Sequence, residues 1–173
     1  MKIKSILFLF FQFIFFNSIS YSDEIEIVSD NIKILENGKI IESIQTSAII
    51  KKKGLYIEGD YSLYDKETEI IQIERNVSFN DRKKNITIET EKAKYNQILD
   101  ILETIGVTNI KIENKYEIIS SNMFYDRKLQ KIYSNKETTI KDTSGNIYNL
   151  EKSFQFDLNN EIITTEKTNI IDT

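Results

Sequence analysis

The sequence predicts an all-β protein built as a twisted, open-ended stack of antiparallel hairpins, a β-jellyroll, and three observations lead to this prediction. Isoleucine dominates the apolar residues, while alanine occurs only at Ala48 and Ala93, and β-branched side chains favour strands. Proline is absent, so nothing interrupts a ladder of paired strands. An aromatic phrase also recurs at a nearly constant spacing, which is typical of stacked supersecondary units.

The recurring phrase places an aromatic residue before a turn-forming residue. Its copies are Tyr64-Asp65, Tyr95-Asn96, Tyr125-Asp126 and Phe156-Asp157, at spacings of 31, 30 and 31 residues. A weaker copy, Ile34-Leu35, lies one period upstream. The repeat unit is therefore a pair of long antiparallel strands, stacked on its neighbours.

Within a unit, apolar residues alternate with polar ones as in a half-buried strand. One face of the segment 71–79 collects Ile71, Ile73, Val77 and Phe79. In the next segment Ile86 and Ile88 take the inner positions, and a one-residue slip then brings Ala93 and Tyr95 inward. Such a slip is what a β-bulge produces.

The following segment alternates less cleanly. We expect Ile101, Ile105 and Val107 on its inner face, although Leu102 is an apolar residue on the outer one. We expect the strands to bend near Gly59 and Gly106, where glycine relaxes the backbone. Polar clusters at 65–68, 80–85, 113–115 and 142–146 predict hairpin turns.

The N-terminus predicts export. Lys2 and Lys4 precede an apolar run, 6–16, and small residues at Ser20 and Ser22 fit a cleavage site. We interpret 1–22 as a signal peptide cleaved after Ser22 and 23–173 as the mature domain. An uncleaved anchor is the alternative, although the apolar run is shorter than the roughly 20 residues of a spanning helix.

Composition argues against several classes of function. Histidine and cysteine are absent, which removes the usual general base, the usual zinc ligands and any thiol nucleophile. The five glycines form no phosphate-binding loop. The net charge of −4 becomes −6 once Lys2 and Lys4 are removed, and an acidic chain suits nucleic acid poorly. We therefore expect no enzyme, no cofactor, no metal and no nucleic-acid partner.

Short motifs recurring in register resemble the LptA/OstA family of lipopolysaccharide-transport proteins, which carry the organic solvent tolerance-like N-terminal domain. The motifs are Gly59-Asp60-Tyr61-Ser62-Leu63-Tyr64-Asp65, then Asn76-Val77-Ser78-Phe79, and the opening Ile27-Val28-Ser29-Asp30-Asn31-Ile32. The resemblance covers about residues 25–165. The chain departs from the family at Arg75, where the family usually has glycine.

The resemblance implies a role as well as a fold. It implies a periplasmic protein that shields the acyl chains of lipid A in an apolar groove between the inner and outer membranes. It also implies end-to-end strand pairing with other OstA-fold proteins, or a head-to-tail homo-oligomer. We expect the unpaired edges near 25–35 and 154–165. A membrane-anchored component or a translocon-type domain without its barrel are alternatives within the family.

The expected groove lining consists of the inward apolar residues of the repeat. They are Ile57, Leu63, Ile71, Ile73, Val77, Phe79, Ile86, Ile88, Ile101, Ile105, Val107, Ile118, Ile132, Ile140, Leu150 and Phe154. The same residues would also form the dry core of an ordinary sandwich, in a structural scaffold with no lipid ligand. The amino-acid pattern does not separate a groove from a filled core.

Overall fold

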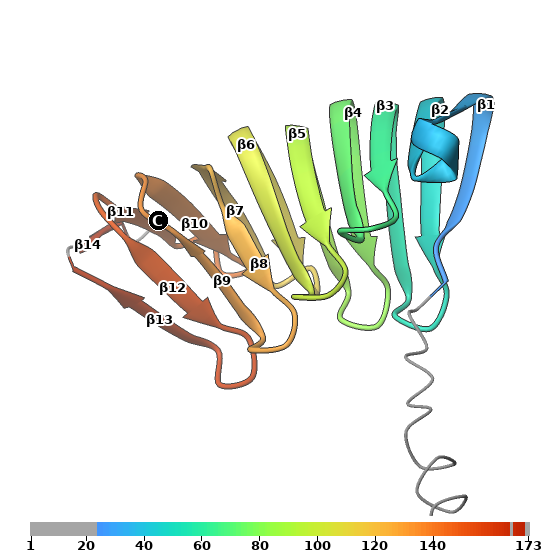
Figure 1. Cartoon of the computed structure of the whole chain (residues 1–173). Coiled ribbons are helices and arrows are strands. Elements are labelled where there is room, and N and C mark those ends of the chain that lie inside the picture. The colour runs from blue at the N-terminus through green and yellow to red at the C-terminus, as the bar shows by residue number, and fades with distance from the viewer. Residues whose placement is uncertain (1–23, 167, 172–173) are drawn as a thin grey trace, which may run out of the picture.

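The described residues fold into one antiparallel sheet of 14 strands. The computed structural model describes residues 24–166 and 168–171 (Figure 1), so the expected signal peptide, 1–22, lies outside the described residues. The first six strands are long: β1 (Glu26–Leu35), β2 (Ile40–Ile50), β3 (Leu55–Asp65), β4 (Ile70–Asp81), β5 (Ile86–Asn96) and β6 (Ile101–Ile112). Within the described ranges the helical structure is a single 3₁₀ turn, η1 (Glu36–Gly38).

The remaining strands are short. They are β7 (Tyr116–Ser121), β8 (Phe124–Asp126), β9 (Lys131–Ser134), β10 (Thr138–Asp142), β11 (Ile147–Leu150), β12 (Phe154–Asp157), β13 (Ile162–Thr165) and β14 (Thr168–Ile171). The all-β prediction is confirmed, and the predicted turns separate β3 from β4, β4 from β5, β6 from β7 and β10 from β11.

Strands β1 to β6 pair in chain order, and β6 is the point where the sheet divides. Its second half pairs with β7 through Val107 to Ile112, while its first half pairs with β8 through Ile101 to Glu103. One branch continues as β7-β10-β11-β14 and the other as β8-β9-β12-β13. Figure 1 shows the two branches diverging beyond β6. Each long strand thus contributes to both halves of a folded-over sheet.

The long strands bend in the middle, where the backbone leaves the extended region. Gln45 of β2 has a φ of 53°, Arg75 and Asn76 of β4 have 63° and 53°, and Gly106 of β6 has 88°. The pairing register shifts at the same level, between β3 and β4, β4 and β5, and β5 and β6. Such bulges bend strands, so the expected bends near Gly59 and Gly106 are confirmed. At Gly59 a Cβ would collide with the side chain of Ile73.

The turns stack at both ends of the hairpins and continue the ladder of backbone hydrogen bonds. In one row Gln97 N donates to Glu69 O at 3.0 Å, and Leu158 N donates to Gln130 O at 2.9 Å. In the other row Glu113 N donates to Asn85 O at 2.8 Å. Equivalent turns therefore follow one another at the period of the aromatic phrase.

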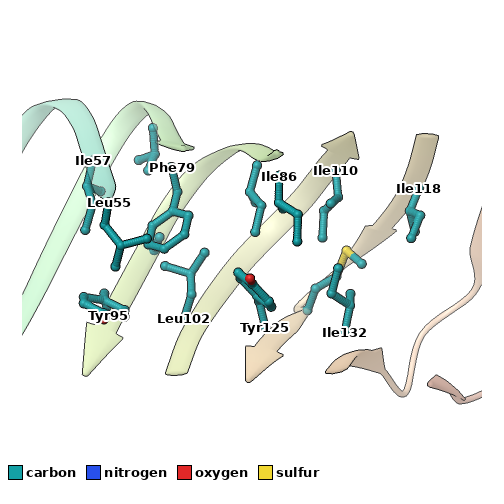
Figure 2. Packing of buried hydrophobic residues seen from close by; sticks show 14 of the residues in the cluster. Leu55, Ile57, Phe79, Ile86, Tyr95, Leu102, Ile110, Ile118, Tyr125 and Ile132 are labelled. Atoms are coloured by element: carbon teal, nitrogen blue, oxygen red, sulfur yellow. The ribbon is translucent and has the colours of Figure 1, made fainter. Parts of the chain in front are cut away.

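The core lies between the two halves of the folded sheet. The four aromatics of the repeated phrase, Tyr64, Tyr95, Tyr125 and Phe156, are all buried. Figure 2 shows the side chains of Ile57 and Phe79 facing those of Tyr95 and Leu102 across the interior. The slip expected in β5 is also present, because Ile86, Ile88, Ala93 and Tyr95 are all buried there.

The unpaired edges differ in part from expectation. The first edge is β1, which pairs with β2 alone, as expected. At the other end β12 is not an edge, because it lies between β9 and β13. The last edges are β13 and β14, one for each branch. The sequence pattern did not reveal that the sheet divides, so it predicted one terminal edge instead of two.

Candidate functional site

The interior between the two halves of the sheet is the candidate site, and it gathers most of the expected lining residues. Those that are buried there are Ile57, Ile71, Ile73, Val77, Phe79, Ile86, Ile88, Ile118, Ile132, Ile140, Leu150 and Phe154. Leu63 and Ile101 are only partly buried and were wrongly expected on the inner face, because the buried positions next to them are Ser62 and Tyr64 in β3 and Leu102 in β6. The lining thus comes from alternating inward positions on many strands rather than from one contiguous segment.

The expected inner face of β6 is wrong. Ile105 and Val107 are 45% and 71% exposed, whereas Leu102, Thr104, Thr108 and Ile110 are buried. The apolar residue Leu102, which broke the expected alternation, was the signal of the true inner face. The buried positions keep one alternation from Leu102 to Ile112, across the bulge at Gly106. The expected face of β6 is therefore the outer one along the whole strand, Ile101 included.

The middle of the interior is filled by side chains. The Phe79 ring lies 5.7 Å from that of Tyr95 and 6.3 Å from that of Tyr125, between ring centroids. Such tilted and edge-on pairs are favourable arrangements of aromatic rings. Tyr95, Tyr125, Leu102 and Met123, which sequence analysis did not include in the lining, are buried in the same cluster. An aliphatic chain therefore displaces side chains if it enters here.

Buried hydroxyl groups line the bend, opposite the tips of the hairpins. Ser43 Oγ lies 2.9 Å from Thr46 Oγ1, and Ser62 Oγ donates to Thr46 Oγ1 at 3.1 Å. Farther along the stack, Thr108 Oγ1 donates to Thr104 Oγ1 at 2.8 Å. These hydroxyls bond one another and are therefore satisfied without water.

The interior is uncovered at the β1 end, where it forms an apolar mouth. A hollow of about 590 Å³ there is lined by Glu24, Ile25, Ile27, Ile32, Ile34, Ile41, Tyr64 and Lys66. Ile34 is 67% exposed, and Ile25, Ile27 and Ile41 pack against the buried cluster. Sequence analysis treated this segment as an edge strand and missed its part in the lining. The weak first copy of the repeat, Ile34-Leu35, was the available signal.

Along the side opposite the bend, the two rows of hairpin turns meet in a seam. A straight strand as long as β4 would span roughly 36 Å at about 3.3 Å per residue, which would keep the rows far apart. Instead, Arg127 of the β8–β9 turn donates from Nε to Asp81 Oδ2 at 2.7 Å, at the far end of β4. Only a sheet folded back on itself brings these ends together.

Four charged residues join the rows at this point, and we call Lys53, Asp81, Asp100 and Arg127 the seam cluster. Arg127 Nη1 donates to both Asp100 oxygens at 2.9 Å, and its Nη2 donates to Lys53 O at 3.1 Å. Lys53 Nζ lies 3.3 Å from Asp100 Oδ1. The phenols of Tyr95 and Tyr125 add hydrogen bonds to Asp100 and Asp81 respectively.

Burial and pairing shift the acidities in the seam cluster. Burial opposes ionisation of Asp100, but hydrogen bonds from Tyr95 and Arg127 outweigh it and hold the pKa of Asp100 below its usual value. Burial raises the pKa of Tyr95, and its hydrogen bond to Asp100 raises it further. At neutral pH Asp100 is therefore a carboxylate and Tyr95 a neutral phenol.

A second contact closes the seam farther along. Lys115 Nζ lies 2.7 Å from Glu161 Oε1, and the rings of Tyr116 and Phe156 meet edge-on at 5.1 Å. Between this contact and the seam cluster is a hollow of about 250 Å³, lined by polar residues of the turns together with apolar residues that include Ile86 and Ile112. The seam is therefore closed at two places and thinner between them.

Residues 24–166 and 168–171 contain no group of three or more acidic residues placed to hold a metal ion. None of the helical structure in these ranges is long and apolar enough to cross a membrane.

These features define a class: an open-ended β-jellyroll whose folded sheet encloses an apolar interior. The model of the OstA-like protein family matches residues 12–150, and the chain belongs to this family. Among solved structures, the chain is similar to LptH of Pseudomonas aeruginosa, described as the LptA-homologous periplasmic component of the conserved lipopolysaccharide transport device. The identity is 8% and the TM-score 0.36, over 88% of this chain and 99% of LptH. A search of curated proteins gives no match.

Proposed function

We propose that this protein shields the acyl chains of lipopolysaccharide in the periplasm, between the inner and outer membranes, without altering the lipid chemically. Membership of the OstA-like family supports the proposal. The observation that carries it is the apolar mouth at β1, which is open to solvent and whose lining residues Ile25, Ile27 and Ile41 pack against the buried cluster. Ile32 and Ile34 are both exposed and line the same hollow, and a group of neighbouring exposed apolar side chains is typical of a binding surface.

The physics of lipid transfer fits such a mouth. Each methylene exposed to water costs about 0.8 kcal/mol, so one chain of a dozen carbons costs roughly 10 kcal/mol. An apolar cavity offsets this cost without a chemical step. The mouth, at about 590 Å³, lies within the range of roughly 300–1,000 Å³ that is typical of ligand pockets.

We propose further that the ends of the sheet pair with other OstA-fold proteins or with a second copy of this chain. Edge strand β1 presents unpaired backbone groups on its outer side, as do β13 and β14 at the other end. Exposed edges accept an added strand. A strand added beside β1 would extend the sheet over Ile32 and Ile34 and so prolong the apolar interior.

A structural scaffold is the second candidate function, and the filled middle of the interior favours it. Phe79, Tyr95 and Tyr125 occupy the space in which an acyl chain would otherwise lie. A membrane-anchored carrier or a translocon-type domain would use the same interior and differ at its N-terminus or its partners. The mass of the exported protein distinguishes a cleaved leader from a retained anchor.

Photocrosslinking distinguishes the carrier from the scaffold. A photoreactive amino acid is placed at Ile34 or Ile41 in the mouth, and as a matched control at Val107, which is exposed but outside the interior. We expect crosslinks to lipopolysaccharide from Ile34 and Ile41 at least several times more often than from Val107. Equal yields at all three positions, or none from the mouth, would defeat the carrier proposal and leave the scaffold.

A further inference from the structure

The seam cluster closes the side of the interior with charges, where an apolar contact would be the ordinary solution. Asp81 is fully buried, and the side chains of Arg127, Asp100 and Lys53 are 8%, 14% and 16% exposed. Replacing a buried ion pair by apolar residues of similar size is often neutral or stabilising. Stability alone therefore does not explain why charged residues occupy this position.

The chemistry of the cluster suits a contact that separates and re-forms. When an apolar seam opens, its side chains meet water at full hydrophobic cost. When the seam cluster opens, two cations and two carboxylates regain hydration, which offsets much of the lost pairing. The partners also lie on different turns: Lys53 and Asp81 belong to one row, and Asp100 and Arg127 to the other. Separating the rows breaks side-chain contacts there but no strand pairing.

The bend on the opposite side is built to act as the hinge. The left-handed residues Arg75, Asn76 and Gly106 interrupt the ladder there, and the register shifts at the same level. Backbone hydrogen bonds hold each half of the sheet together on either side of these bulges. Rotation about the bend would thus open the tips of the hairpins first.

We propose that the seam cluster is a latch: it holds the interior shut along its side, and its release admits an aliphatic chain between the two rows of turns. This rests on the proposed lipid-shielding function and adds a lateral route to the one through the mouth. The opening would widen at the hollow beside the latch, whose lining includes Ile86 and Ile112. The contact between Lys115 and Glu161 closes the far end of that opening.

A cysteine-reactivity experiment tests the latch without lipid. The chain contains no cysteine, so one introduced thiol reports on one place. Ile86 is 1% exposed and pairs across the strands with Asp81, beside the seam cluster, whereas Ser62 is buried at the bend. The two reporter variants are therefore Ile86→Cys and Ser62→Cys. The labelling rate of each thiol by a maleimide is measured in the full mature chain, with and without Arg127→Met. Local opening of a protein requires less free energy than global unfolding. A thiol that local opening exposes is therefore labelled faster than one that only global unfolding exposes.

The latch predicts that Arg127→Met speeds labelling of Ile86→Cys at least tenfold, because this position lies at the seam, while labelling of Ser62→Cys changes less than threefold. Lys39→Met, which removes an exposed ion pair with Glu67, leaves both rates unchanged. Equal acceleration of both thiols by Arg127→Met would mean global destabilisation and would overturn the latch. If Arg127→Met does not fold, Asp100→Asn serves instead, because it keeps the bond from Arg127 to Asp81; no selective acceleration in that variant also overturns the proposal.

A second experiment, with lipopolysaccharide, tests the latch and the carrier function separately. Photoreactive residues at Ile73, in the middle, and Ile34, in the mouth, are compared with and without Arg127→Met. We expect lipopolysaccharide crosslinks at Ile73 to rise at least threefold while those at Ile34 hold steady. Crosslinks at Ile34 alone, unchanged at Ile73, would leave the carrier and remove the latch. No crosslink at either position would remove the carrier, whatever the thiols show.

Discussion

Arg127 Nε and Asp81 Oδ2 lie 2.7 Å apart although the two residues are 46 positions apart in the chain. The contact ties the β8–β9 turn to the far end of β4, and Asp81 is fully buried. Arg127 also bonds Asp100 through Nη1. One guanidinium thus links three segments across the seam.

Removal of the guanidinium should destabilise the fold strongly. We expect Arg127→Met to lower the free energy of unfolding by about 3–5 kcal/mol, since it leaves the Asp81 carboxylate buried and unpaired. Urea denaturation measures the change. The control Lys39→Met removes a pair whose side chains are 52% and 63% exposed and should cost at most about 1 kcal/mol. Equal losses in the two variants would show that Asp81 is not buried as described.

The seam cluster should also make stability depend on pH in the acid range. The pKa of Asp100 is held below its unfolded value of 3.8, so its ionised form stabilises the fold above that value. This contribution is lost as the pH falls from the unfolded pKa through the lower folded one. We expect the difference in unfolding free energy between wild type and Asp100→Asn to be constant from pH 7 to 5 and to shrink below about pH 4. A difference that grows on acidification would contradict the shift.

Arg75 tests whether the bend is strained. It has a φ of 63° and an exposed side chain, and a left-handed conformation costs roughly 1–2 kcal/mol for most L-residues. Part of this is offset by the greater unfolded-state entropy of glycine. We expect Arg75→Gly to stabilise the protein by about 0.5–1 kcal/mol in urea denaturation.

The reverse change at Gly106 is the matched control for the bend. Gly106 has a φ of 88°, and no atom lies within 4 Å of where its Cβ would be. Gly106→Ala therefore meets backbone strain alone and should cost about 1 kcal/mol. If both substitutions destabilise equally, the left-handed backbone is not the reason for glycine at this level of the repeat.

The true inner face of β6 predicts a contrast between neighbouring residues. Leu102 is 1% exposed and Ile105 is 45% exposed. We expect Leu102→Ala to cost about 2–5 kcal/mol and Ile105→Ala less than about 1 kcal/mol in urea denaturation. A larger loss of stability for Ile105→Ala than for Leu102→Ala would show that Ile105 lies on the inner face of β6.

Sequence by itself determined the class of fold, the period of the repeat and the faces of most strands. The reason is local: β-branched residues, alternation and turn residues act over a few positions. Ile71, Ile73 and Phe79 could therefore be placed on the inner face from the residue pattern alone. The aromatic phrase was also informative, because the aromatic residue of each copy lies near the end of a strand and is buried in the core.

Only the tertiary structure decided what depends on residues distant in the chain. The fold of the sheet decides three such features: the division of the sheet at β6, the contact between Arg127 and Asp81, and the uncovered mouth at Ile34. Both faces of β6 carry apolar residues, so the residue pattern alone did not decide between the face of Ile105 and Val107 and the face of Leu102 and Ile110. Local preference specifies a strand and its faces, whereas packing between distant strands decides where the strand bends and what its ends touch.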